Sequence, residues 1–118
     1  MNKLLAFVIA MLLLACASVV AQTPKAAGNA QNGKRIYVSY GCYQCHGREG
    51  QGSAATGPRI GPRPIPFAVF AQYVRQPAGQ MPPYTSKIVT DSELADIYAF
   101  LQARPQPTAV KNIPLLNE

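Results

Sequence analysis

Two cysteines and the only histidine of this 118-residue chain lie within five consecutive residues, Cys42-Tyr43-Gln44-Cys45-His46. This spacing is the C-x-x-C-H pattern typical of covalent haem c attachment. Two thiols three residues apart on one helical turn can both form thioethers to neighbouring edges of a porphyrin. The residue after the second cysteine is then carried under the iron, where an imidazole nitrogen can bind it. The motif therefore predicts one haem c, attached through Cys42 and Cys45, with His46 as an iron ligand.

Three other uses of the cysteine pair are weaker. A tetrahedral zinc site needs four ligands, and the motif offers Cys42, Cys45 and His46 with no second C-x-x-C to complete the set. A thioredoxin-like dithiol is expected between a strand and a helix, and no strand is predicted before the motif. A structural disulfide is compatible with export, but a three-residue spacing closes a very small loop and adds little stability.

A second iron ligand is indicated by elimination. The chain has three methionines, of which Met1 and Met11 lie in the N-terminal leader described below, and it has no second histidine. If the iron has two protein ligands, Met81 is the strongest candidate for the second. Its setting, Gly79-Gln80-Met81-Pro82-Pro83-Tyr84, is not a helical pattern, and the prolines restrict the backbone so that a thioether can be held in place. The alternative is an ordinary methionine in the core or in an exposed turn.

The N-terminus has the pattern of a secretory signal peptide. Lys3 precedes an apolar run from residue 4 to 14, and Val19-Val20-Ala21 supplies a small-residue cleavage site. The run is too short for a stable transmembrane helix, so no membrane span is expected in the mature chain. Leu13-Leu14-Ala15-Cys16 also resembles a lipobox, in which Cys16 would become a lipidated N-terminus. Either processing route places the domain in an oxidising compartment, with the periplasm as the expected location.

The charge of the chain limits its partners. Its formal net charge is +6, and removal of the signal peptide with Lys3 leaves ten basic and five acidic residues, a net of +5. The basic residues are scattered, and Lys34-Arg35 is the only adjacent pair. Together with export, this pattern argues against nucleic-acid binding. It favours proteins with acidic docking surfaces as partners.

Helices are expected to position the motif residues. Three segments repeat apolar residues at intervals of three and four, as on one face of a helix. The first begins at Ala30, the second is stopped by Gln76-Pro77, and the third is opened by the capping box Thr90-Asp91-Ser92-Glu93 and stopped by Pro105. The repeating residues are Gly33, Ile36, Tyr37 and Tyr40, then Phe67, Phe70, Ala71 and Val74, then Leu94, Ile97, Tyr98 and Leu101.

The intervening segments suggest a fold built around a bound group. Residues 47–66 contain five glycines and four prolines, and a loop of this length suits a compact domain if it wraps something large. Residues 105–118 contain three prolines and are expected to run extended over the surface or to be loose. The predicted organisation is a signal peptide at 1–21, a lead-in at 22–29, one domain at 30–104 and a proline-rich tail at 105–118. No internal repeat or strand pair is evident.

These residues resemble the class I c-type cytochromes over roughly residues 28–104. Gly33 and Tyr37 are similar to the glycine and aromatic of that family's N-terminal helix, which crosses the C-terminal helix. Residues 94–101 look like the C-terminal helix, with Tyr98 as the partner aromatic of Tyr37. The resemblance implies a small all-α cytochrome c fold, with crossing terminal helices, a short middle helix and long Gly/Pro-rich loops around one haem.

The resemblance also implies roles for site residues. Gly57-Pro58 resembles the family's Gly-Pro after the haem motif, which implies that the Pro58 carbonyl accepts a hydrogen bond from the His46 ring nitrogen that does not bind iron. Met81 matches the distal methionine. Four arginines in or near the segments that would wrap the haem are candidates to pair with its propionates, the alternative being solvated surface charges. They are Arg48, Arg59, Arg63 and Arg75.

The implied function is one-electron transfer rather than catalysis. The chain looks most like small bacterial monohaem cytochromes, some of which are diffusible carriers and others subunits of periplasmic dehydrogenases; a terminal oxidase is a further possible partner. The tail at 105–118 departs from a minimal carrier and is a candidate docking segment. The alternative from the enzyme class is a haem peroxidase or a gas-binding sensor, which would need an open or labile sixth position on the iron.

Overall fold

The computed structural model describes residues 28–116, which form an all-α domain followed by a tail. The elements are α2 (Ala30–Ser39), α3 (Tyr43–His46), α4 (Phe67–Arg75) and α5 (Asp91–Gln102), then two short 3-10 turns, η1 (Val110–Asn112) and η2 (Pro114–Leu116). Residues 28–116 contain no strand, and one isolated bridge joins Ser53 to Gly57. The predicted signal peptide, Cys16 and most of the lead-in lie outside the described residues, as do 117–118.

The three predicted helices are present with caps that the sequence encodes. The Asn29 side chain accepts hydrogen bonds from the first backbone amides of α2, and the helix ends before Gly41, which has a φ of 77°. Thr90 and Glu93 form the expected capping box at the start of α5. Helix α4 ends at Arg75, immediately before Gln76-Pro77.

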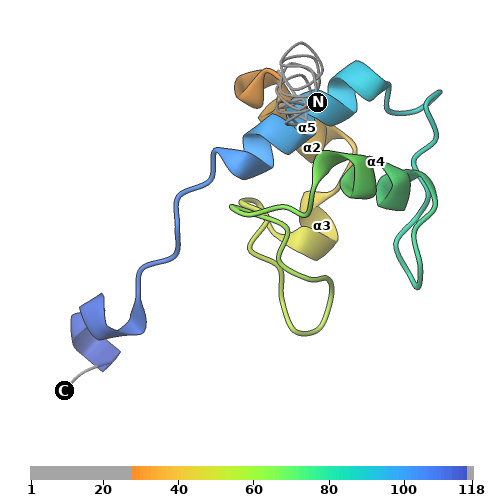
Figure 1. Cartoon of the computed structure of the whole chain (residues 1–118). Coiled ribbons are helices and arrows are strands. Elements are labelled where there is room, and N and C mark those ends of the chain that lie inside the picture. The colour runs from red at the N-terminus through yellow and green to blue at the C-terminus, as the bar shows by residue number, and fades with distance from the viewer. Residues whose placement is uncertain (1–27, 117–118) are drawn as a thin grey trace, which may run out of the picture.

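Helices α2 and α5 pack against each other, which confirms the predicted crossing of the terminal helices (Figure 1). Gly33 lies so close to α5 that a Cβ there would overlap the carbonyl oxygen of Asp96. The Asp96 carboxylate accepts a hydrogen bond from the Asn29 amide at 2.6 Å and from the Asn32 side chain at 2.7 Å. The glycine therefore permits a contact that Asp96 then fixes.

The aromatic pairing at this crossing differs from the expectation. The ring of Tyr37 contacts Phe100, with centroids 5.2 Å apart, rather than Tyr98. Tyr98 instead packs against Phe67 and Phe70, with centroids 5.1 and 5.3 Å apart. Two residues along an α-helix turn by about 200°, so Phe100 and Tyr98 face opposite sides of α5. Helix α5 thus packs against α2 on one side and against α4 on the other.

The Gly/Pro-rich loop folds back on the motif and on α5. The Gly52 amide donates to the His46 carbonyl at 2.7 Å, and the Ile60 amide donates to the Gly50 carbonyl at 2.8 Å. Gly50 is buried against the Leu101 side chain with a φ of 67°, so a larger residue is excluded there. The loop is therefore ordered by hydrogen bonds to the motif and within itself, and by its contact with α5.

The tail is partly different from the extended or loose segment expected. Residues 105–109 have no regular structure, but η1 and η2 follow and contact each other. Figure 1 shows the tail leaving the end of α5 and running away from the helices. Within residues 28–116, no helix is long and apolar enough to cross a membrane.

Candidate haem site

Four of the five C-x-x-C-H residues form the single helical turn α3, and Cys42 is its N-cap residue, bonded directly to α2. The Cys42 amide donates to the Tyr37 carbonyl at 3.1 Å, and the His46 amide donates to the Cys42 carbonyl at 3.1 Å. Gly47 ends the turn with a φ of 76°, and its carbonyl accepts the Tyr37 hydroxyl at 2.8 Å. Tyr37 therefore fixes the motif at both ends relative to the helix crossing, through its backbone carbonyl at Cys42 and its hydroxyl at Gly47.

The two cysteines are not joined in a disulfide. Cys42 is half-buried, and burial raises the pKa of its thiol to about 11. A thiol with so high a pKa is protonated at neutral pH, whereas dithiol redox catalysts depend on a lowered thiol pKa. Cys45 is exposed at the edge of the same turn. This arrangement is unlike that of a thioredoxin-type pair.

His46 is buried, and its orientation is set by the Gly57-Pro58 segment. The Nδ1 atom donates to the Pro58 carbonyl at 2.8 Å. Because a carbonyl can only accept, this bond places the ring proton on Nδ1 and leaves the Nε2 lone pair available to a metal. Gly57 packs against the same ring, where a Cβ would lie 3.2 Å from Cε1 and Nδ1. The Thr56 hydroxyl, which the sequence did not indicate, donates to the Cys45 carbonyl at 2.7 Å.

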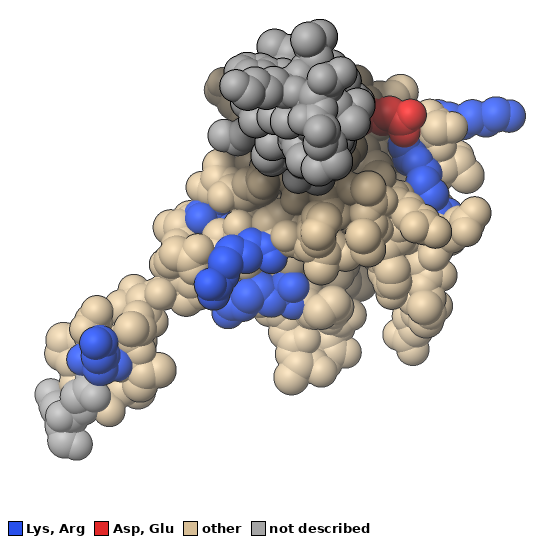
Figure 2. Space-filling view, viewed as in Figure 1, with Lys and Arg blue, Asp and Glu red and all other residues tan. Residues whose placement is uncertain are grey.

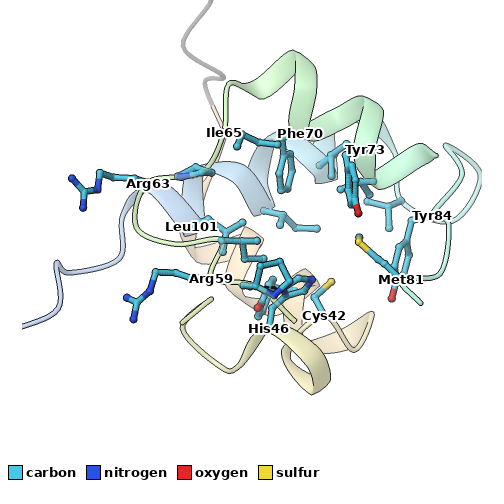
Figure 3. A pocket seen from close by; sticks show the side chains of 18 residues that line it. Cys42, His46, Arg59, Arg63, Ile65, Phe70, Tyr73, Met81, Tyr84 and Leu101 are labelled. Carbon is cyan, nitrogen blue, oxygen red and sulfur yellow. Dashed lines mark hydrogen bonds between the residues drawn. The ribbon is translucent and has the colours of Figure 1, made fainter. Parts of the chain in front are cut away.

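His46 and Met81 come from separate parts of the chain and line one cavity of about 310 Å³ together with Cys42 (Figure 3). Met81 follows α4 and is partly buried against the core. The remaining lining is mostly apolar and comes from α2, α4, α5, the Gly/Pro-rich loop and the segment between α4 and α5. It includes Tyr37, Ile60, Pro64, Ile65, Phe70, Val74, Val89, Leu94, Ile97 and Leu101.

The cavity suits a flat, largely apolar group that carries a metal. Two thiols on one turn suit covalent attachment of a porphyrin, and an imidazole with a free lone pair and a thioether are the kinds of donor that bind a haem c iron. Within residues 28–116, no cluster of three or more His, Cys, Asp and Glu side chains is arranged to hold a metal ion directly. The zinc alternative therefore has no support in the described part of the chain.

The four candidate arginines separate into two pairs. Arg59 and Arg63 line the cavity, and Figure 3 shows their guanidinium groups pointing outward on the same side of it. Arg48 lies over the Tyr43 ring at 5.1 Å. Arg75 is held by the Tyr84 carbonyl and the Asp91 carboxylate. Arg59 and Arg63 thus remain the candidates to meet propionates.

Two tyrosines that line the cavity were missed from the sequence, Tyr73 and Tyr84. The Tyr73 hydroxyl donates to the Ala78 carbonyl at 3.3 Å, and the Tyr84 hydroxyl donates to the Tyr40 carbonyl at 2.9 Å. Tyr84 directly follows the prolines after Met81, which was the available signal. Its distant partner was not readable from the sequence.

The crossing helices, the motif turn and the common cavity together define a small all-α cytochrome c domain. Residues 28–101 match the family model described as cytochrome c oxidase, cbb3-type, subunit III, and the chain belongs to this family. It is accordingly a c-type cytochrome. It carries a covalently bound haem c with its iron and functions in haem-based electron transfer. No curated protein and no solved structure shows a significant match to the chain.

Proposed function

We propose that this chain is an exported one-electron transfer protein in which Cys42 and Cys45 would form the thioethers to haem c and His46 and Met81 would bind its iron. The observation that carries the proposal is the placement of His46 and Met81 on separate segments that face one apolar cavity beside Cys42. When bound, the haem iron supplies reversible one-electron chemistry.

The protein's own groups set the conditions for that chemistry. The Pro58 carbonyl holds the His46 ring in one orientation and raises the basicity of its free nitrogen. A methionine thioether favours the reduced iron, so a His/Met pair gives a higher reduction potential than two imidazoles. The apolar lining excludes water, and the packed helices keep both ligands in place, which limits reorganisation during electron transfer.

The partner is proposed to be a protein with an acidic docking surface. Residues 28–116 contain nine basic and four acidic residues, a net of +5. Arg59 and Arg63 border both the cavity and a hollow formed with Gln106 and Pro107, where the tail leaves the domain. Figure 2 shows basic side chains gathered near this point. Such a surface accelerates encounter with an acidic partner, so the association rate should fall as ionic strength rises.

Methionine ligation is tested by the absorbance of the purified holoprotein. The ferric form should show the charge-transfer band of a methionine–iron bond, and Met81→Ala should abolish it while leaving haem covalently attached. Met81→Ala should also bind carbon monoxide rapidly when reduced. Rapid carbon monoxide binding by the unaltered protein would contradict the closed site and favour the peroxidase or sensor alternative.

Covalent attachment through the motif has a separate test. Haem should remain with the denatured polypeptide on a gel, and Cys42→Ser together with Cys45→Ser should remove it. Retention of haem staining in this double variant would contradict attachment through these two cysteines.

A second candidate function is that of a fixed cytochrome subunit in a larger oxidase or dehydrogenase. The matched family is described as an oxidase subunit, and the tail exposes apolar side chains, with Leu115 82% and Leu116 62% exposed. Deletion of 105–118 should then abolish co-purification with the larger enzyme while leaving the absorbance unchanged. A diffusible carrier would keep its electron-transfer rate after the deletion.

Export is proposed from the N-terminal sequence. A mature N-terminus at Gln22, in the soluble periplasmic fraction, is the expected result of cleavage after Ala21. A lipidated N-terminus at Cys16, in the membrane fraction, would establish the lipoprotein alternative instead.

A further inference from the structure

The segment that carries Met81 has little structure of its own. Residues 76–90 join α4 to α5 through turns, without a helix or strand. Gly79, two residues before Met81, has a φ of 73° and open space around its Cα. The backbone before Met81 is therefore not fixed locally, and the position of the thioether depends on contacts made elsewhere in the segment.

Tyr84 supplies three such contacts, each to a different group. Its amide donates to the Val74 carbonyl at 3.0 Å, and its carbonyl accepts from Arg75 at 2.8 Å, so its backbone is bound to the last turn of α4. Its hydroxyl donates to the Tyr40 carbonyl at 2.9 Å, two residues before Cys42. This last bond joins the Met81 segment directly to the residues between α2 and the haem-attachment turn.

The hydroxyl is suited to this role at neutral pH. Burial raises the pKa of Tyr84 above its ordinary value, so the group keeps the proton that it donates. The rings of Tyr40 and Tyr84 also meet edge to face, with centroids 6.5 Å apart. The contact is thus both polar and apolar.

Arg75 extends the same connection to α5. One nitrogen of its guanidinium donates to the Tyr84 carbonyl, and another pairs with the Asp91 carboxylate at 2.6 Å. The Arg75 side chain is only 20% exposed, although Asp91 is 89% exposed. A planar guanidinium can make both bonds at once, which a lysine ammonium cannot do in the same geometry.

We infer that Tyr84 and Arg75 are positioning residues that hold Met81 at the cavity and so determine how often the sixth coordination position opens. The inference rests on the proposed function, since it presumes that Met81 is the sixth ligand. Neither residue touches the iron in this account. Each acts by fixing the end, at Tyr84, of the segment that carries Met81. The start of this segment, at Ala78, is held by the Tyr73 hydroxyl.

The experiment measures carbon monoxide binding to the reduced holoprotein, because carbon monoxide enters when the methionine leaves. Tyr84→Phe removes the hydroxyl while retaining the ring and both backbone bonds. Loss of one hydrogen bond of ordinary net strength should increase the open population, and thus the binding rate, about fivefold. The methionine–iron band should weaken or disappear at a lower temperature than in the unaltered protein.

Tyr98→Phe is the matched control. The Tyr98 hydroxyl also donates to a loop carbonyl, that of Ile65 at 3.1 Å, but Ile65 lies on the opposite side of the cavity from Met81 (Figure 3). The two variants should lose similar unfolding free energy, whereas only Tyr84→Phe should change carbon monoxide binding. Arg75→Leu should accelerate binding about tenfold through loss of a charged hydrogen bond, and Arg75→Lys should restore part of the slow rate.

The possible results separate the two levels of the proposal. Suppose that the unaltered protein has the methionine–iron band and that Tyr84→Phe binds carbon monoxide as slowly as the unaltered protein does. The positioning role is then overturned, while Met81 ligation stands. Equal acceleration in Tyr98→Phe would also overturn it, because general loosening would then explain the effect. Absence of the band in the unaltered protein would overturn Met81 ligation, and the positioning role with it.

Discussion

The cavity proposed to hold haem is lined by residues of the hydrophobic core. It measures about 310 Å³ and is bordered by every helix of the domain, α2 to α5. We predict that the chain without haem does not form a cooperatively folded domain. The perturbation is the double variant Cys42→Ser with Cys45→Ser, purified free of haem.

The magnitude follows from the volume. An unfilled apolar cavity costs about 24 cal/mol per Å³, so 310 Å³ corresponds to at most about 7 kcal/mol. A domain of this size has a total unfolding free energy of about 4 to 13 kcal/mol. The buried residues that face the cavity include Phe70, Val74, Leu94 and Ile97, so leaving it empty removes contacts from the centre of the core. The cost is therefore comparable to the whole stability of the domain.

The assay compares thermal unfolding of the two proteins by circular dichroism, together with the dispersion of their proton NMR spectra. The haem-bound protein should unfold in one sharp transition with dispersed resonances. The haem-free variant should show reduced helical signal, a gradual transition and narrow dispersion. A sharp transition with native-like dispersion in the haem-free chain would refute the reasoning, since the helices would then pack without the bound group.

Three further predictions concern the crossing of α2 and α5 and can be measured on the haem-bound protein by denaturant unfolding. Gly33→Ala should lower the unfolding free energy by about 2 kcal/mol, because the new methyl overlaps the Asp96 carbonyl, while Lys34→Ala on the exposed side should have little effect. Asp96→Ala should cost about 2 kcal/mol through loss of two hydrogen bonds to a charged group; an unchanged value would show that they contribute nothing. Burial, and to a smaller extent the charge of Glu49, raises the pKa of Tyr37 well above its ordinary value of 10.0. The unfolded chain therefore releases this proton first, stability should fall as the pH rises above about 10, and Tyr37→Phe should lessen that fall.

Much of the fold could be predicted because its signals are local. The capping box at Thr90, the stop at Gln76-Pro77 and the spacing of apolar residues lie within the segments that they organise. The C-x-x-C-H motif is local too, since one turn carries all three of its reactive groups. For such features, residues close together in the sequence determine the structure, so the sequence alone is enough to predict them.

The partner of Tyr37 was not predictable in the same way. Tyr98 and Phe100 are both aromatic residues on the buried part of α5, and the sequence pattern places both near α2 or α4. The choice depends on the rotation of α5 about its own axis. That rotation is fixed by Asp96, which bonds to Asn29 and Asn32 across more than sixty residues. No local signal reports such a contact.

The same limitation explains why Met81 could be proposed as a ligand from the sequence whereas the residues that support it could not. A methionine between prolines and glycine, in a chain with no second histidine, is a conspicuous candidate ligand. The hydroxyl of Tyr84 meets the Tyr40 carbonyl only because α2 ends beside the cavity, 44 residues away in sequence. The type of a residue therefore indicates whether it can bind the iron, whereas contacts made in the assembled fold determine how long it stays bound. A closed sixth position, on which the distinction between electron carrier and gas-binding protein depends, requires both.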